Sequence, residues 1–127
     1  MTKQMRIFTI GYESTTVDEF IAALREAGVA MAVSTDHNPG TSPTLSLPLM
    51  IHLACVDFRL TPEEAVRGAT VHAARALGLA DRGRLAPGLR ADFALWELEH
   101  PRDLAYWFGH PLCRRSIVGA IDTGHAS

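Results

Sequence analysis

The sequence predicts an α/β fold, in which a partial (β/α) barrel-like layer is joined to a small β element formed by the carboxyl-terminal strands. A strand pattern at 6–10 and an apolar run at 30–34 enclose a helical pattern at 16–27. A strand, a helix and a strand in that order favour a parallel pair with a right-handed crossover. Two further strand candidates, Asp92–Trp96 and Arg115–Gly119, follow a helical middle section and supply the small β element.

The first unit is a strand followed by a helix. Arg6–Ile10 alternates toward a strand. Thr16 and Glu19 have the spacing of a capping box, in which the hydroxyl and the carboxylate accept hydrogen bonds from the first free backbone N–H groups. Gly28 ends the helix. Its apolar residues recur at helical spacing, at Val17, Phe20, Ile21 and Leu24.

A polar loop then follows the apolar run 30–33, which is suited to a buried strand. Residues 34–41 read S-T-D-H-N-P-G-T, and their proline and glycine force an irregular connection. Asp36 is therefore expected at the carboxyl end of a strand, the edge where parallel α/β architectures bind ligands. Taken alone, the octapeptide favours a simpler interpretation, an Asx-turn in which Asp36 or Asn38 bonds nearby backbone N–H groups.

The sequence after the loop predicts several helical segments. Residues 45–58 have helical spacing, and Pro48 is tolerable there only in the first turn. The run T-P-E-E at 61–64 is a strong helix start, with threonine as the cap and glutamate at the third position. The alanine-rich run 71–77 ends at a glycine. Pro101 opens a short helix that reaches about residue 107.

Four motifs carry a resemblance to a known family. They read S-T-D-H-N-P-G-T-S-P-T-L-S-L-P-L-M at 34–50, F-R-L-T-P-E-E-A at 58–65, A-A-R-A-L-G-L at 73–79 and G-L-R-A-D-F-A-L-W at 88–96. From about residue 28 to 120 the chain resembles the carboxyl-terminal part of imidazolonepropionase, a metal-dependent hydrolase of the amidohydrolase superfamily. The first motif is specific to that family, and the last is shared across the superfamily. In the family the strands at 92–96 and 115–119 leave the barrel, so we expect them to pair as a separate β layer.

The resemblance implies a reaction and roles for four residues. The reaction is hydrolysis of 4-imidazolone-5-propanoate to N-formimidoyl-L-glutamate in histidine degradation, with zinc or iron as the metal. Asp36 matches the aspartate that ligates the metal and accepts a proton from its bound water. Asn38 and Gly40 match positions that contact the propanoate or the product, and Thr41 matches one that contacts the imidazolone. His37 matches no ligand and is expected to pack within the loop.

Most ligands of such a metal centre are missing from the sequence. A catalytic site of this kind needs three or more protein ligands and an open position for water. The family's H-x-H pair is absent, and none of the six histidines falls on a strand end that the family uses: His37, His52, His72, His100, His110 and His125. We therefore expect an imidazolonepropionase-like fragment that is inactive alone. Zinc or iron is implied by resemblance only, and a chain without metal is the alternative.

Residues 1–127 are predicted to form a single domain of two origins. The first 27 residues resemble the opening of a family of small uncharacterised bacterial proteins with a T-I-G-[HY] motif, although the aspartate–arginine pair of that family is absent. Residues 28–120 are the imidazolonepropionase-like part, and 121–127 are a tail. A complete barrel takes about 250 residues, which this chain of 127 cannot supply.

The resemblance implies a small-molecule substrate, and bulk properties exclude several other partners. A formal charge of −2 with interspersed signs offers no basic face for nucleic acid, and no apolar stretch approaches a membrane span. The two cysteines form no C-x-x-C pair, so a cytoplasmic location fits best.

Two alternatives to the enzyme remain. One is a non-catalytic module that forms a homo-oligomer, because 47% of its residues are hydrophobic. The other is a weak anion binder through Asn38–Thr41.

Overall fold

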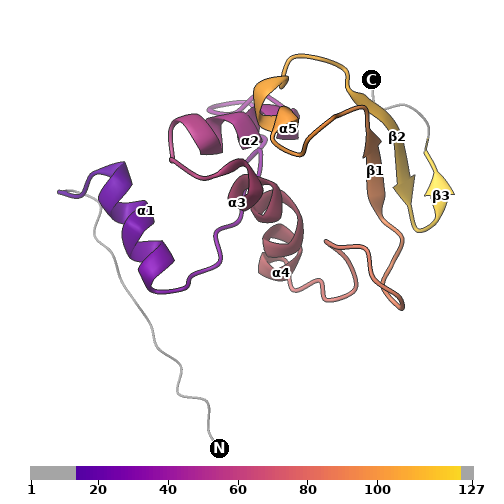
Figure 1. Cartoon of the computed structure of the whole chain (residues 1–127), viewed down its shortest axis with the longest axis horizontal. Helices are drawn as coiled ribbons and strands as arrows, with labels where there is room; N and C mark the ends of the chain where they lie inside the picture. Colours follow the sequence, from indigo (N-terminus) through magenta and orange to yellow (C-terminus); the bar gives the residue numbers. More distant parts are fainter. Residues whose placement is uncertain (1–13, 124–127) are drawn as a thin grey trace, which may run out of the picture.

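The computed structural model describes residues 14–123 of the chain. Figure 1 shows the helices gathered on one side of the molecule and a small sheet on the other. The elements are, in order, α1 (Val17–Glu26), α2 (Leu47–Val56), α3 (Pro62–Arg67), the π-helical turn η1 (Gly68–His72), α4 (Ala73–Ala76), β1 (Phe93–Trp96), α5 (Asp103–Tyr106), β2 (Cys113–Val118) and β3 (Ile121–Asp122).

The helix starts predicted at Thr16 and Thr61 are confirmed, whereas the helices predicted from residues 45 and 101 begin two residues later, at Leu47 and Asp103. In α1 the Thr16 hydroxyl accepts a hydrogen bond from the Glu19 backbone N–H at 3.3 Å, while the Glu19 carboxylate accepts one from the Thr16 N–H at 2.8 Å. Thr61 and Glu64 repeat this capping box in α3, at 3.2 and 2.8 Å. Pro48 lies in the first turn of α2, where the missing proline N–H costs no intrahelical bond.

The predicted β layer near the carboxyl terminus is also confirmed. β1 pairs antiparallel with β2, with Phe93 opposite Ile117, and β2 pairs antiparallel with β3. The sheet order is β1-β2-β3. β2 begins at Cys113, two residues before the predicted start, and its register with β1 shifts next to Trp96.

The predicted parallel layer is not confirmed. Arg6–Ile10 lies outside the described residues, and every strand pairing within 14–123 is antiparallel. The segment 30–34 belongs to no strand among the described residues, and Ala30, Ala32 and Ser34 are exposed. The expectation of a buried strand at 30–33 is therefore not met, because the segment has no strand pairing within residues 14–123 and its residues are exposed or half-buried.

A helix occupies one edge of this segment instead. The Val33 N–H donates to the Gly68 carbonyl at 3.1 Å, and His72 Nδ1 lies 3.1 Å from the Met31 carbonyl oxygen. A β-carbon added to Gly68 would lie 2.8 Å from Val33 Cγ2, so only glycine permits this close approach. The π-helical turn therefore fixes the segment that leads into the 34–41 loop.

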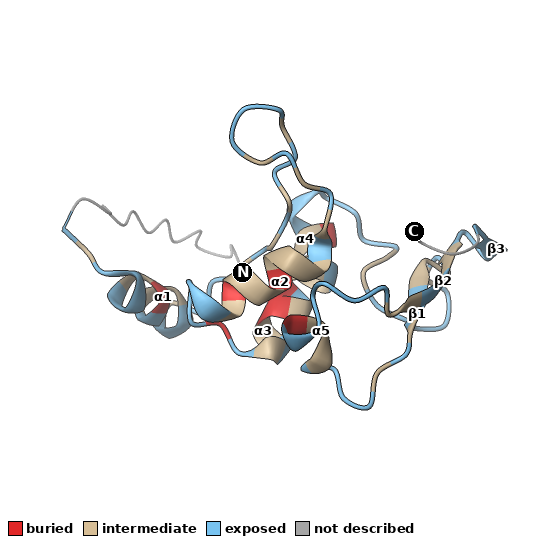
Figure 2. Ribbon diagram, turned by 90° about the horizontal axis from the view of Figure 1, so that it is seen from above, coloured by how far each residue is buried: buried red, intermediate tan, exposed pale blue. Residues whose placement is uncertain are grey.

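The buried core lies among the helices and the loop residue that precedes α3. Figure 2 shows the buried residues in red on the helices and none on the labelled strands. The buried hydrophobic residues of the described chain are Ile21, Ile51, Ala54, Leu60, Ala65, Ala74 and Ala105. Four of these seven are alanines, so the core is small for a chain of this length. Within the described residues, no helix is both long and apolar enough to cross a membrane.

Candidate functional site

Asp36 stands at the start of the polar loop with its side chain exposed. Its φ is 47°, in the left-handed region that non-glycine residues adopt only occasionally and aspartate more readily than most. Within residues 14–123, no group donates a hydrogen bond to its carboxylate. Both carboxylate oxygens are therefore open to a substrate or a cation that reaches the loop.

Asn38 determines the shape of this loop. Its Oδ1 accepts hydrogen bonds from the backbone N–H groups of Gly40 at 2.9 Å and Thr41 at 2.8 Å. Its Nδ2 donates to the Asp36 carbonyl at 2.8 Å and lies 3.1 Å from Thr41 Oγ1. The Asx-turn expected from the octapeptide is thus confirmed at Asn38, and it uses both ends of the side-chain amide.

Three further contacts close the loop on itself. The Asn38 N–H donates to the Ser42 carbonyl at 3.1 Å, and Ser42 Oγ donates to the Thr35 carbonyl at 2.6 Å. His37 Nδ1 lies 3.1 Å from the Thr44 carbonyl oxygen, which makes that nitrogen the donor. His37 itself is exposed, and this one bond joins it to Thr44 just beyond the loop. The exposed groups of the loop therefore include Asp36, Gly40 and Thr41.

The loop does not offer free backbone N–H groups to an anion at its predicted position. The N–H groups of Gly40 and Thr41 already donate to Asn38 Oδ1. α2 is capped by Ser46, whose hydroxyl accepts the Leu49 N–H at 3.3 Å. These bonds use the donors that anion binding through Asn38–Thr41 would need.

The residues present do not fit a catalytic metal centre. Within residues 14–123, no three histidine, cysteine, aspartate or glutamate side chains come together in a way that would hold a metal ion. His52 Nδ1 bonds the Ala105 carbonyl at 2.8 Å and His72 the Met31 carbonyl, each away from Asp36. A single carboxylate lacks the three or more ligands that such a centre needs.

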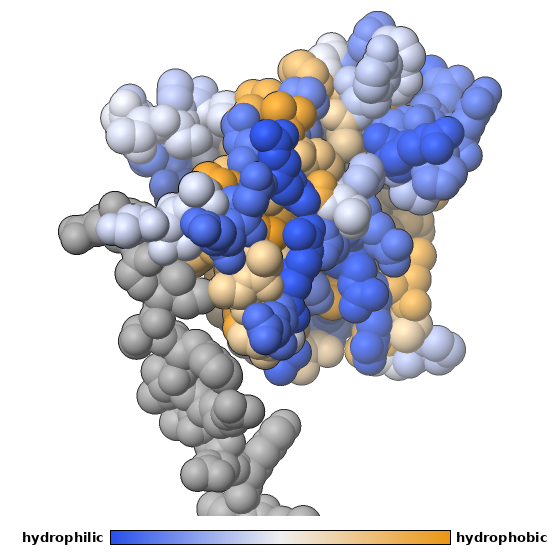
Figure 3. All heavy atoms as spheres, turned by 60° about the vertical axis from the view of Figure 1, so that its left-hand side comes forward, coloured by the Kyte–Doolittle hydropathy of each residue, from blue (hydrophilic) through white to orange (hydrophobic). Residues whose placement is uncertain are grey.

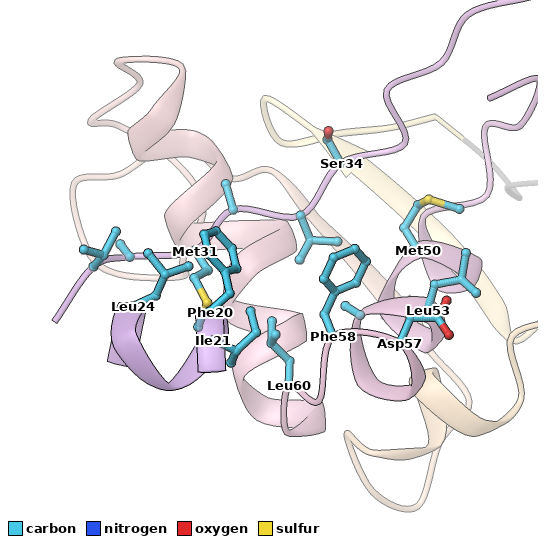
Figure 4. Close-up of a pocket in the computed structure, with 15 residues that line it drawn as sticks. Phe20, Ile21, Leu24, Met31, Ser34, Met50, Leu53, Asp57, Phe58 and Leu60 are labelled. Atoms are coloured by element: carbon cyan, nitrogen blue, oxygen red, sulfur yellow. The ribbon is translucent and has the colours of Figure 1, made fainter. Parts of the chain in front are cut away.

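An apolar groove lies beside the segment that leads to Asp36. It has a volume of about 510 Å³ and is lined by α1, residues 29–34, and α2 with the turn after it; we call it the α1–α2 groove. In Figure 4 the side chains of Phe20 and Leu24 from α1 lie on one side, and those of Met50 and Phe58 lie on the other. Figure 3 shows apolar side chains reaching the surface between hydrophilic ones on this side of the molecule.

Sequence reasoning missed this groove. The apolar spacing of Val17, Phe20, Ile21 and Leu24 predicted a helix but gave no indication of a groove beside it. The signal that would have revealed the groove is the pairing of two apolar helices with the small residues Ala30, Ala32 and Ser34 between them. Small exposed residues on an extended segment leave a groove rather than a filled interface.

Ion pairs hold the frame around the site but lie outside the loop. The Arg25 guanidinium donates to both carboxylate oxygens of Glu64, at 2.9 and 2.6 Å, and thereby ties α1 to α3. These bonds, with the Thr61 N–H, lower the pKa of Glu64 from 4.5 to about 2. In the sheet, the Gly119 N–H and then Arg90 lower the pKa of Asp92.

Comparison with known proteins gives a consistent family. The amidohydrolase family matches residues 5–122. The imidazolonepropionase of Cereibacter sphaeroides is 64% identical over 89 residues, which are 70% of this chain and 22% of that protein. The imidazolonepropionase of Cupriavidus taiwanensis is 66% identical over 106 residues, which are 82% of this chain and 25% of that protein.

A solved structure supports the same assignment. The amidohydrolase from Thermotoga maritima superposes with a TM-score of 0.64 at 26% sequence identity, covering 84% of this chain and 26% of that one. In each comparison the chain spans about a quarter of the length of the protein it matches.

Proposed function

Since the chain belongs to the amidohydrolase family, we propose that its Asp36 loop serves the imidazolonepropionase reaction, the hydrolysis of 4-imidazolone-5-propanoate to N-formimidoyl-L-glutamate. The observation that carries the proposal is the S-T-D-H-N-P-G-T loop, which presents an unbonded carboxylate in a chain 64 to 66% identical to imidazolonepropionases over most of its length.

In this proposal Asp36 is the proton acceptor. Its carboxylate is exposed and receives no hydrogen bond from residues 14–123, which suits a group that must take a proton from an attacking water. Gly40 and Thr41 present the substrate-binding edge, because they are the exposed part of the turn beyond Asp36. Asn38 acts indirectly, because its amide is used to hold that turn.

The family relation implies a metal, and the resemblance points to zinc or iron. The described residues do not fit a metal centre, because no three histidine, cysteine, aspartate or glutamate side chains among them come together to hold a metal ion. We therefore assign no reaction step to a metal in this chain and propose that the chain alone does not hydrolyse the substrate. Both cysteines are free thiols, which supports the expected cytoplasmic setting.

One experiment tests the loop as a ligand site. Isotopically labelled chain is titrated with N-formimidoyl-L-glutamate and followed by amide chemical shifts. We expect the amide signals of Gly40 and Thr41 to move, and to move less in Asn38→Ala, in which the turn loses its organising amide. Shifts confined to residues outside 34–44, or no shifts at all, would refute the assignment of substrate binding to this loop.

A second experiment tests the proposed lack of activity. Metal content and substrate depletion are measured for the native chain, for Asp36→Ala, and for the control Asp57→Ala, which removes another exposed carboxylate. We expect less than stoichiometric metal and background rates in all three. Stoichiometric metal and turnover that disappear only in Asp36→Ala would show that the chain builds a complete site.

A further inference from the structure

We propose that the cavity between the end of α4 and residues 78–84 binds a phosphate monoester through Arg75 and Arg84. The cavity has a volume of about 390 Å³ and shares no lining residue with the Asp36 loop; we call it the arginine cavity. The inference goes beyond the proposed function and requires neither the imidazolone substrate nor a metal, so its failure leaves that proposal untouched.

The charged side chains that line the arginine cavity are all arginines, namely Arg75, Arg82 and Arg84. Arg82 is compensated, because its guanidinium donates to Asp81 at 2.9 and 3.1 Å and to Asp92 at 3.3 Å. The side chains of Arg75 and Arg84 make no hydrogen bond or ion pair within residues 14–123. Two uncompensated positive charges in one cavity repel each other, and an anion between them removes that repulsion.

The end of the helix does not need these arginines as caps. Arginine side chains near a helix end can donate to its last carbonyls. Here the carbonyls of Ala73, Ala74 and Arg75 already accept the N–H groups of residues 77, 79 and 78, at 3.1, 2.9 and 3.1 Å. The guanidinium of Arg75 is therefore available to a ligand.

A close backbone contact fixes the loop against the helix. Gly83 has a φ of 89°, and a β-carbon there would lie 2.8 Å from Ala74 Cβ and 3.0 Å from the Thr70 carbonyl oxygen. Arg84 follows this contact directly and is thereby held beside the helical turn that carries Arg75. Because the backbone positions of both arginines are set before a ligand arrives, less ordering is needed on binding.

A second set of contacts anchors the loop toward the sheet. Figure 1 shows the chain leaving α4 and running to β1. The Arg90 N–H donates to the Asp81 carbonyl at 2.8 Å, and the Asp92 carboxylate accepts hydrogen bonds from Arg82 and Arg90. Both carboxylates near the cavity are therefore engaged, and a turn of either one toward Arg84 would break an existing ion pair.

The lining of the arginine cavity favours a phosphate monoester. A guanidinium presents a planar fork of N–H donors that matches phosphate oxygens. A phosphate monoester carries a charge of about −1.5 to −2 at pH 7, which matches the two uncompensated arginines. Val71 and Leu79 also line the cavity, and its volume leaves room beyond the phosphate itself. These two side chains supply an apolar wall for the organic group of the ester.

The test is a titration of the isotopically labelled 127-residue chain with phenyl phosphate, followed by the side-chain Nε–H signals of its arginines. We expect the signals of Arg75 and Arg84 to move and to saturate. Arg75→Gln and Arg84→Gln should each bind at least about tenfold more weakly, because each removes a charged donor. The control Arg102→Gln removes an exposed arginine outside the cavity and should bind as the native chain does.

Two further ligands and one further variant separate this site from general attraction between charges. Inorganic phosphate lacks the ring that covers Val71 and Leu79, and benzoate carries only one charge, so both should bind more weakly than phenyl phosphate. Arg84→Lys keeps the charge but loses the fork, and its affinity should fall between those of the native chain and Arg84→Gln.

Four outcomes would overturn the proposal. The first is a native chain whose arginine signals do not saturate, and the second is equal weakening in Arg84→Gln and Arg102→Gln. The third is benzoate or inorganic phosphate binding as tightly as phenyl phosphate. The fourth applies if Arg84→Gln does not fold, in which case native affinity in Arg84→Lys decides against the site.

Discussion

Asn38 is the residue on which the shape of the 34–41 loop depends most. Its side-chain oxygen accepts two backbone N–H groups, and its side-chain nitrogen donates to the Asp36 carbonyl. The bond to Asp36 helps to hold the residue at its positive φ of 47°. The conformation that exposes the Asp36 carboxylate is therefore set by the amide two residues later.

Removal of this amide tests that dependence. Asn38→Ala is expected to destabilise the chain by about 0.5 to 1.5 kcal/mol, because the exposed turn loses three hydrogen bonds between the side-chain amide and the backbone. Asn38→Asp keeps an oxygen acceptor for Gly40 and Thr41 but loses the donor to Asp36, so its loss should be smaller. Urea unfolding followed by circular dichroism measures both. Equal stability of Asn38→Ala and the native chain would contradict this account.

Glu64 makes the stability of the helical part depend on pH. The Arg25 guanidinium, followed by the Thr61 N–H, holds its folded-state pKa at about 2, below the ordinary 4.5. A carboxyl whose pKa is lowered on folding stabilises the fold fully above its unfolded pKa. That contribution declines as the pH falls from about 4.5 toward 2. Acid should therefore weaken the contact between α1 and α3.

Comparison with Glu64→Gln isolates this effect. The native chain should lose stability to urea between pH 5 and pH 2 more steeply than Glu64→Gln, which has no proton to gain there. The neighbouring Glu63 is exposed and forms no ion pair in the described chain, so Glu63→Gln should keep the native slope. Parallel slopes for the native chain and Glu64→Gln would contradict the assignment.

At the scale of elements, the π-helical turn η1 was not foreseen. The sequence predicted the start at Thr61 and the alanine-rich run 71–77, and both are present as one helix interrupted at Gly68–His72. A π turn depends on contacts beyond the local pattern. Here Thr70 Oγ1 donates back to the Val66 carbonyl at 2.7 Å, and the Gly68 carbonyl accepts the distant Val33 N–H. Helical periodicity alone contains neither contact.

Gly68→Ala tests the close approach at this turn. The new methyl group would lie 2.8 Å from Val33 Cγ2 and 3.1 Å from the Met31 carbonyl oxygen. We expect a loss of about 1 to 3 kcal/mol in the free energy of unfolding, as for other overpacked sites. Gly109→Ala is the matched control, because a β-carbon there meets nothing within 4 Å. If both variants unfold at the same urea concentration, the segment 29–34 is not held as described.

For the whole molecule, the sequence predicted local features better than distant ones. Both capping boxes, the glycine ends of the helices and the β1–β2 pair follow from spacing or from the family resemblance. The predicted neighbour of 30–34, Arg6–Ile10, lies outside the described residues, so that pairing stays a prediction. At the site, the Asx-turn at Asn38 was predictable from residue types.

The sheet and the helices are built on different interactions. No residue of β1, β2 or β3 belongs to the buried core, which is helical apart from Leu60. The sheet is instead tied together by Asp92, which accepts hydrogen bonds from the Gly119 N–H at 2.7 Å, Arg90 at 2.8 Å and Arg82 at 3.3 Å. Elements without buried apolar contacts open at a lower free energy than the core.

We therefore expect the sheet to open without the helices. In native-state hydrogen exchange, the amides of Glu97 and Ala120 beside the strands, bonded at 2.9 and 3.1 Å, should exchange well before the Ala65 amide in α3.

Asp92→Asn keeps an oxygen for Gly119 but loses the charge that attracts Arg82 and Arg90. It should speed exchange in the sheet about fivefold, equivalent to about 1 kcal/mol, and leave Ala65 unchanged. The exposed Asp57→Asn serves as the control. A common exchange rate for Glu97, Ala120 and Ala65 in the native chain would show one cooperative unit and refute independent opening.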